Sequence, residues 1–134
     1  MLGTNEGQSL RGQLERQMQA REAELTRRQE ELATFAQEIE TGFELLTPQA
    51  QAEKVQEYQQ RVQELQTLYE QYQREVATAE MQGTSQIGER LIDVIAEIAQ
   101  ERGYTLVIEK SALLYGLPAD EFTQEVIDRY NAQN

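Results

Sequence analysis

The chain has 134 residues, enough for one ordinary domain, and it contains no cysteine and no histidine. Its 24 acidic and 12 basic residues give a net charge of −12, which argues against nucleic acid or an anionic membrane as a partner, because both attract positively charged surfaces. The absence of cysteine excludes disulfides and thiolate metal sites. No stretch approaches the roughly 20 apolar residues that span a bilayer, so we expect no stable membrane insertion.

The first predicted element is a long helix, since no glycine or proline occurs between Gln13 and Thr41. One row of apolar side chains recurs there at every seventh position: Met18, Leu25, Leu32, Ile39 and Leu46. Arg21 and Arg28 interrupt the second row of this heptad pattern. At these positions they would make the helical pair splay or flex. The alternative interpretation, which we favour, is that their guanidinium groups simply reach water at the rim of the seam.

The second predicted helix carries a more regular heptad pattern. Four successive pairs fill both seam positions: Val55/Tyr58, Val62/Leu65, Tyr69/Tyr72 and Val76/Ala79. Such sustained occupancy predicts a supercoiled helix that packs on another helix. At this spacing, a packing seam is far commoner than a cofactor site.

A short connection from Gly42 to Pro48 joins the two helices. Thr47 is the predicted N-cap of the second helix, and Pro48 suits its first turn. So short a connection makes the helices antiparallel neighbours. Folding the chain about residue 45 brings positions 32 and 58, 25 and 65, and 18 and 72 together, to within about one helical turn.

The apolar pattern becomes wider near the end of the second helix. It includes Ile87, Leu91, Ile92, Val94, Ile95, Ile98 and Ala99. A face this broad predicts burial in the body of the molecule. We expect a soft spot in the helix at residues 83–85, where Gly83 interrupts the pattern.

The pattern changes to that of a strand after Gly103, which follows the helix as a C-cap glycine does. Tyr104, Leu106 and Ile108 would form one face of a strand over residues 104–109. A second apolar run covers residues 112–115. A last helix is expected after an N-cap at Thr123, with its inward side chains at Val126, Ile127 and Tyr130.

Two short strands are not stable alone in water, and the chain supplies no third strand. We therefore expect an oligomer whose sheet gains strands from other copies, from a removed N-terminal segment, or from both. The candidate oligomerisation residues are Tyr104, Leu106, Ile108, Leu113 and Tyr115.

The predicted fold class is mainly α with a small β element (α+β). Residues 1–7 form an N-terminal remnant, and residues 8–86 form a long antiparallel helical hairpin, or arm, with its tip near 42–48. The body, residues 87–134, contains the end of the second helix, the two short strands and the C-terminal helix.

The tail carries a more specific pattern. The run Gly103-Tyr-Thr-Leu-Val-Ile-Glu-Lys-Ser-Ala-Leu-Leu-Tyr-Gly116, followed by Glu121-Phe-Thr123 and Val126-Ile127, resembles the C-terminal signature of the Skp (OmpH) family of periplasmic chaperones. The hairpin, rich in glutamine and glutamate, resembles the arms of that family. Asn5-Glu-Gly-Gln8 resembles the start of its first helix, so the resemblance covers nearly the whole chain.

The resemblance implies an ATP-independent holdase located in the periplasm. It implies a homotrimer in which a small β body joins three subunits, and three helical hairpins enclose a cavity that holds unfolded outer-membrane β-barrel proteins. No catalysis and no cofactor are implied.

Three features depart from the family pattern. A signal peptide and a first strand of the type Ile-x-Val-Val-Asp are missing, so we expect a trimmed chain. The best-known members have strongly basic arms, whereas 19 acidic residues precede Gly103 here, so attraction to lipopolysaccharide is not carried over. Glu121-Phe-Thr123 stands where the family often has Asp-Ile-Thr, at a helix cap.

Client contacts are expected from apolar side chains near the tip or outside the seam. The candidates are Phe43, Leu45, Leu46 and Leu68. For each of them, packing within the hairpin is the alternative interpretation.

An enzymatic role is not expected, because the chain lacks histidine and cysteine, a glycine-rich phosphate loop and any metal-ligand spacing. The main alternative to a chaperone is a structural coiled-coil spacer or adaptor with no client. A chaperone of the prefoldin type is disfavoured, since prefoldin subunits place their β-hairpins between the two helices, and here the predicted strands follow the second helix.

Overall fold

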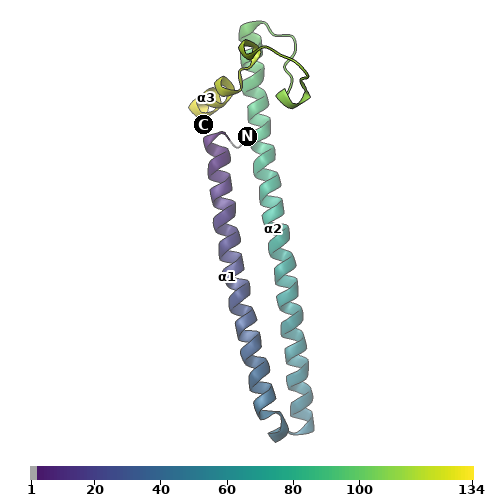
Figure 1. Cartoon of the computed structure of the whole chain (residues 1–134). Coiled ribbons are helices and arrows are strands. Elements are labelled where there is room, and N and C mark those ends of the chain that lie inside the picture. Colours follow the sequence, from purple (N-terminus) through teal and green to yellow (C-terminus); the bar gives the residue numbers. More distant parts are fainter. Residues whose placement is uncertain (1–2) are drawn as a thin grey trace. The chain divides into compact units, whose positions relative to one another are not determined.

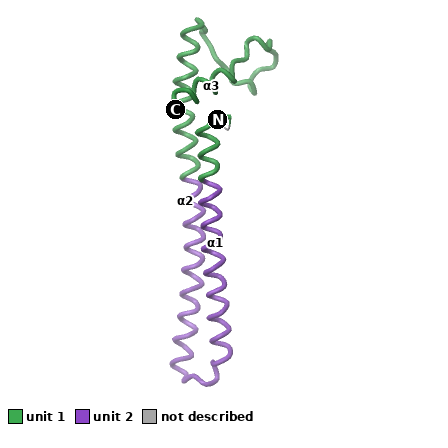
Figure 2. Tube along the Cα trace, turned by 90° about the vertical axis from the view of Figure 1, so that its left-hand side faces the viewer, with its two compact units in different colours: residues 1–13, 79–134 green, residues 14–78 purple. Residues whose placement is uncertain are grey.

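The computed structural model describes residues 3–134, which form helices joined by short turns and one irregular segment (Figure 1). The α-helices are α1 (Asn5–Gly42), α2 (Pro48–Arg102) and α3 (Thr123–Gln133). Three short 3-10 helices are η1 (Phe43–Leu45), η2 (Lys110–Ala112) and η3 (Pro118–Asp120). The chain divides into two compact units, coloured separately in Figure 2: a hairpin unit of residues 14–78, and a terminal unit of residues 1–13 and 79–134.

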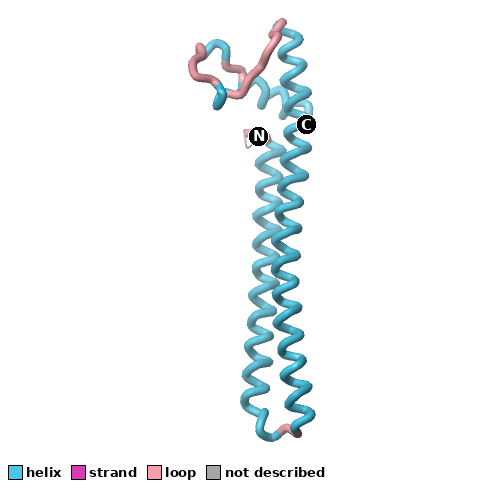
Figure 3. The backbone as a smooth tube through the Cα atoms, turned by 90° about the vertical axis from the view of Figure 1, so that its right-hand side faces the viewer, coloured by secondary structure: helices cyan, strands magenta, loops and turns pink. Residues whose placement is uncertain are grey.

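The hairpin unit consists of the adjacent parts of α1 and α2 and the turn between them. The two helices run side by side and antiparallel there (Figures 1 and 3). The predicted N-cap is confirmed, because the backbone N–H of Ala50 donates to Oγ1 of Thr47 at 3.2 Å. The side-chain amide of Gln51 closes the turn by donating to the carbonyl of Phe43 at 2.8 Å.

The seam of the hairpin unit is narrow. Its half-buried apolar residues include Leu25, Leu32 and Ile39 of α1, and Tyr58, Leu65, Leu68, Tyr72 and Val76 of α2. Phe35, at 8 % exposure, is the one described residue of this unit that counts as buried. Most of the surface of both helices therefore stays in water.

Three of the four positions in one row of the predicted seam are wrong. Val55, Val62 and Tyr69 were expected to pack between the helices, but each side chain is exposed. A pair of helices buries only one face of each, and the contact line on α2 follows Tyr58, Leu65 and Tyr72 instead. The exposed side chains of Val55, Val62 and Tyr69 lie on the flank of the hairpin, beside the seam.

Arg21 does not splay the helices. Its Nη2 lies 2.9 Å from Oε2 of Glu75, and its guanidinium carbon lies 4.3 Å from the centre of the Tyr72 ring. The arginine thus joins α1 to α2 by an ion pair and by a cation–π contact. These contacts set the register about one turn from the predicted pairing of position 18 with position 72.

The core of the terminal unit lies between α2 and α3. Its buried side chains are Ile87, Val94, Ile98, Val126 and Tyr130, with Leu10, Leu91, Ile95 and Phe122 packed against them. The broad apolar face predicted for α2 is thus largely confirmed, although Ile92 is 66 % exposed. The helix α3 begins one residue earlier than predicted, with Phe122 in place of Thr123 as its N-cap and no capping side-chain bond.

The two informative glycines of this unit have different roles. The predicted soft spot at Gly83 is not seen, because α2 is continuous from Pro48 to Arg102. A Cβ at Gly83 would lie 2.7 Å from Cδ1 of Leu10, so this glycine permits close packing. Gly103 has φ 70° and ends α2, as the sequence predicted.

The start of α1 is anchored by polar contacts. Oγ1 of the buried Thr4 accepts a hydrogen bond from the backbone of Gly7 at 3.0 Å. Nη1 of Arg90 donates to both carboxylate oxygens of Glu6, at 2.8 and 3.0 Å, and the hydroxyl of Tyr130 donates to the same carboxylate. Part of the predicted remnant, residues 1–7, is therefore helix; residues 1 and 2 lie outside the described chain.

The two predicted strands are not formed. Among residues 3–134 no strand occurs, and the segment after Gly103 is an irregular loop interrupted by η2 and η3 (Figure 3). Two contacts join the beginning and the end of this loop. The ring of Tyr104 stacks on that of Phe122, with 5.7 Å between the ring centres, and Lys110 forms an ion pair with Glu121 at 3.0 Å. A strand needs a neighbour to satisfy its backbone, and no neighbour is present in the described chain.

The hydroxyl of Tyr130 makes a testable contribution to stability. Burial of the ring, and then the hydrogen bond to Glu6, raise the pKa of Tyr130 above its ordinary value. A raised pKa in the folded state means that the contribution is complete below about pH 10 and is lost as the pH rises through the folded-state pKa. We expect Tyr130→Phe to cost about 1 kcal/mol at pH 7 and to lose less stability than the wild type above pH 10.

Urea unfolding of both proteins at pH 7 to 11, followed by circular dichroism, measures this difference. A constant difference in the free energy of unfolding across that range would contradict it. The remaining tyrosines are common to both proteins, so they serve as the internal control.

Candidate interaction surfaces

The tip of the hairpin unit presents one apolar side chain fully to solvent. Leu45 is 91 % exposed in η1, whereas Phe43 and Leu46 are half-buried. Between Arg28 and Lys54 the chain carries six glutamates and no basic residue. The tip is therefore an acidic surface with an exposed leucine at its end.

Leu68 does not belong to this surface. It is half-buried along the seam, about 30 Å from the turn at 1.5 Å per residue of helix. The structure thus brings Phe43, Leu45 and Leu46 together and leaves Leu68 with the packing residues. For Leu68, packing within the hairpin is the interpretation that its burial favours.

The tail forms the second candidate surface. Every residue from 103 to 121 is exposed, including all five oligomerisation candidates. Leu106 is 77 % exposed and Tyr115 is 82 % exposed, while Tyr104, Ile108 and Leu113 lie between 40 % and 52 %. So much apolar surface on one segment indicates a binding surface, because single soluble chains seldom expose contiguous apolar patches of this kind.

Sequence reasoning missed a third surface. The exposed row of Val55, Val62 and Tyr69 was assigned to the seam because its heptad spacing matches that of a packing position. The sequence does carry a signal for it: glutamines, rather than charged residues, stand four positions after each member of the row. A second row without charge beside a coiled-coil seam indicates a surface for another partner.

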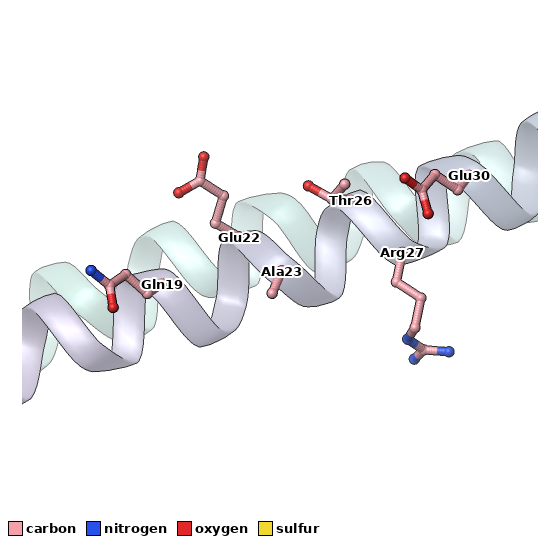
Figure 4. A pocket seen from close by; sticks show the side chains of 6 residues that line it. All are labelled: Gln19, Glu22, Ala23, Thr26, Arg27 and Glu30. Atoms are coloured by element: carbon pink, nitrogen blue, oxygen red, sulfur yellow. The ribbon is translucent and has the colours of Figure 1, made fainter.

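The described residues contain no cluster of three or more potential metal ligands. The depression in Figure 4 is lined only by side chains of α1: Gln19, Glu22, Ala23, Thr26, Arg27 and Glu30. It is a shallow helix face. Beside it, hydrogen bonds from Arg27 and then from Arg28 lower the pKa of the Glu24 carboxyl, an ordinary effect of neighbouring ions on one helix.

A comparison with models of known protein families shows which family the chain is related to. A family model described as "Outer membrane protein (OmpH-like)" matches residues 1–130. The chain belongs to this family. Comparisons with curated proteins and with solved structures gave no match.

The family assignment bears on the class of function. The OmpH-like family is a family of periplasmic chaperones of outer-membrane proteins, so the match supports a chaperone-like role in general. The resemblance of its tail and arms to the Skp (OmpH) family is confirmed. None of the described helices has a stretch long and apolar enough to cross a membrane.

Proposed function

We propose that this protein is an ATP-independent holdase that binds unfolded outer-membrane β-barrel proteins in the periplasm and prevents their aggregation. The observation that carries the proposal is the family match over residues 1–130. The exposed tail and the thinly packed hairpin add physical support, because both are features of a protein that works by contact with other chains.

Assembly would come through the tail. The apolar residues between Tyr104 and Tyr115 are exposed in one copy, and their alternating pattern suits a strand. Three copies that exchange such strands would satisfy the backbone groups and bury the exposed side chains in one small β body. The homotrimer is the assembly that the proposal adopts.

Client binding would rest on many weak contacts. The hairpin unit has a single buried residue, Phe35, so the parts of α1 and α2 in it can move at low cost in packing energy. Several hairpins that surround one unfolded chain raise the effective concentration of each weak contact. At the tip, Leu45 supplies an exposed apolar contact, with Phe43 and Leu46 beside it.

The assembly predicts a specific effect of charge in the tail. Leu106→Glu combined with Ile108→Glu should prevent strand exchange, because each glutamate would have to be buried without a partner. We expect the wild type to have a molar mass of about three times 15.4 kDa, and the variant to fall to one copy while its helix content stays unchanged. Light scattering coupled to size exclusion measures this, and a wild type of one copy would contradict the trimer.

The function predicts protection of a denatured client. An outer-membrane barrel protein diluted from urea should scatter less light when the chain is present, without ATP and with no further effect when ATP is added. Suppression should approach completion near one assembly per client. Light scattering that the chain leaves unchanged would contradict the holdase function and favour a structural spacer.

A further inference from the structure

One face of α2 in the hairpin unit carries no charge. We call it the neutral band; its residues recur at intervals of three or four: Pro48, Gln51, Val55, Gln59, Val62, Gln66, Tyr69, Gln73 and Ala77. At 100° per residue these positions stay within about 40° of a single line, and the band is about 45 Å long. The eight charged residues of α2 between positions 48 and 78 all lie outside it.

The middle of this band is open to solvent. Val55, Val62 and Tyr69 are 42 %, 38 % and 49 % exposed. The side chains of Gln59 and Gln66 are also exposed and form no hydrogen bond within residues 3–134. Gln73 donates to the hydroxyl of Tyr69 at 2.7 Å. Apolar groups and amides thus alternate along the band.

This alternation suits an extended polypeptide. A glutamine amide both donates and accepts hydrogen bonds, so it can pair with the free N–H and C=O groups of a chain that has not yet formed its sheet. Valine and tyrosine can contact the apolar residues that alternate along such a chain. The rest of the hairpin unit carries 13 acidic and 7 basic residues. It therefore offers no continuous row of uncharged hydrogen-bonding groups and apolar side chains.

We propose that the neutral band is the surface that binds the client. Its occupant is an uncharged, extended segment of an unfolded outer-membrane protein, one that becomes a β-strand when the barrel folds. This inference rests on the proposed holdase function and assigns it a residue set and a substrate class. The band selects segments that lack charge, because an unpaired charge held against it would lose hydration without gaining a partner. A second acidic copy of the same hairpin is a poorer occupant, since its charged flanks would repel those of the first.

Two pairs of substitutions separate the band from the net charge. Gln59→Glu with Gln66→Glu places two charges on the band, and Gln56→Glu with Gln63→Glu places the same two charges outside it. All four glutamines are exposed and free of side-chain hydrogen bonds within residues 3–134. Each pair also creates one like-charged neighbour, Glu70 in the first case and Glu53 in the second.

The measurement is the Kd for a fluorescently labelled outer-membrane barrel protein, diluted from urea into each assembled protein. We expect the band variant to bind about tenfold more weakly and the control variant to stay within about twofold of the wild type. Circular dichroism melts of all three proteins should agree within a few degrees, which shows that the hairpin is intact.

Equal affinities for both variants, whether unchanged or equally reduced, would overturn the neutral band as the client surface. A change in molar mass of the band variant alone, with no change in client affinity, would also overturn it by assigning the band to a second copy. Failure of the wild type itself to bind the client would instead reject the proposed function, and with it this inference.

Discussion

A pair of antiparallel helices has only one seam, and the remaining faces of both helices stay in water. In the hairpin unit this seam is so narrow that Phe35 is its one buried residue, held beneath the side chains of Arg61 and Lys54 at 4.0 and 5.3 Å from the ring centre. Arg21, on Glu75 and Tyr72, joins the helices in the same manner. The hairpin therefore depends on cations over aromatic rings as well as on apolar packing, and it leaves long free surfaces.

The terminal unit also leaves part of its apolar surface exposed to water. It has a compact apolar core of five buried residues between α2 and α3, closed by Tyr130 and the carboxylate of Glu6. Residues 103–121 lie outside this core, and their leucines, isoleucine and tyrosines remain exposed. One copy of the chain thus has a packed core in its terminal unit but leaves the apolar side chains of residues 103–121 uncovered. The proposed assembly and the proposed client surface assign a partner to each exposed region.

Sequence reasoning predicted much of this fold. Glycine and proline positions located both long helices, Thr47 and Gly103 marked the two ends of α2, and the broad apolar run from Ile87 identified the buried face of α2. It failed where the outcome depends on a partner: residues 104–109 alternate as a strand does, yet a strand forms only beside another. It also failed for Val55, Val62 and Tyr69, because heptad spacing alone does not say which of two apolar rows faces the neighbouring helix. Among the proposed site residues, only exposure could separate Leu45 from the half-buried Leu68.

We expect residues 103–121 to become structured only when copies of the chain come together. Hydrogen exchange of the backbone amides in residues 104–117, measured on the protein in solution, tests it most directly. We expect exchange at least about a hundredfold slower than in an unstructured peptide, because paired strands protect their N–H groups. Exchange at the rate of a free peptide, in a protein whose α2 amides remain protected, would contradict it.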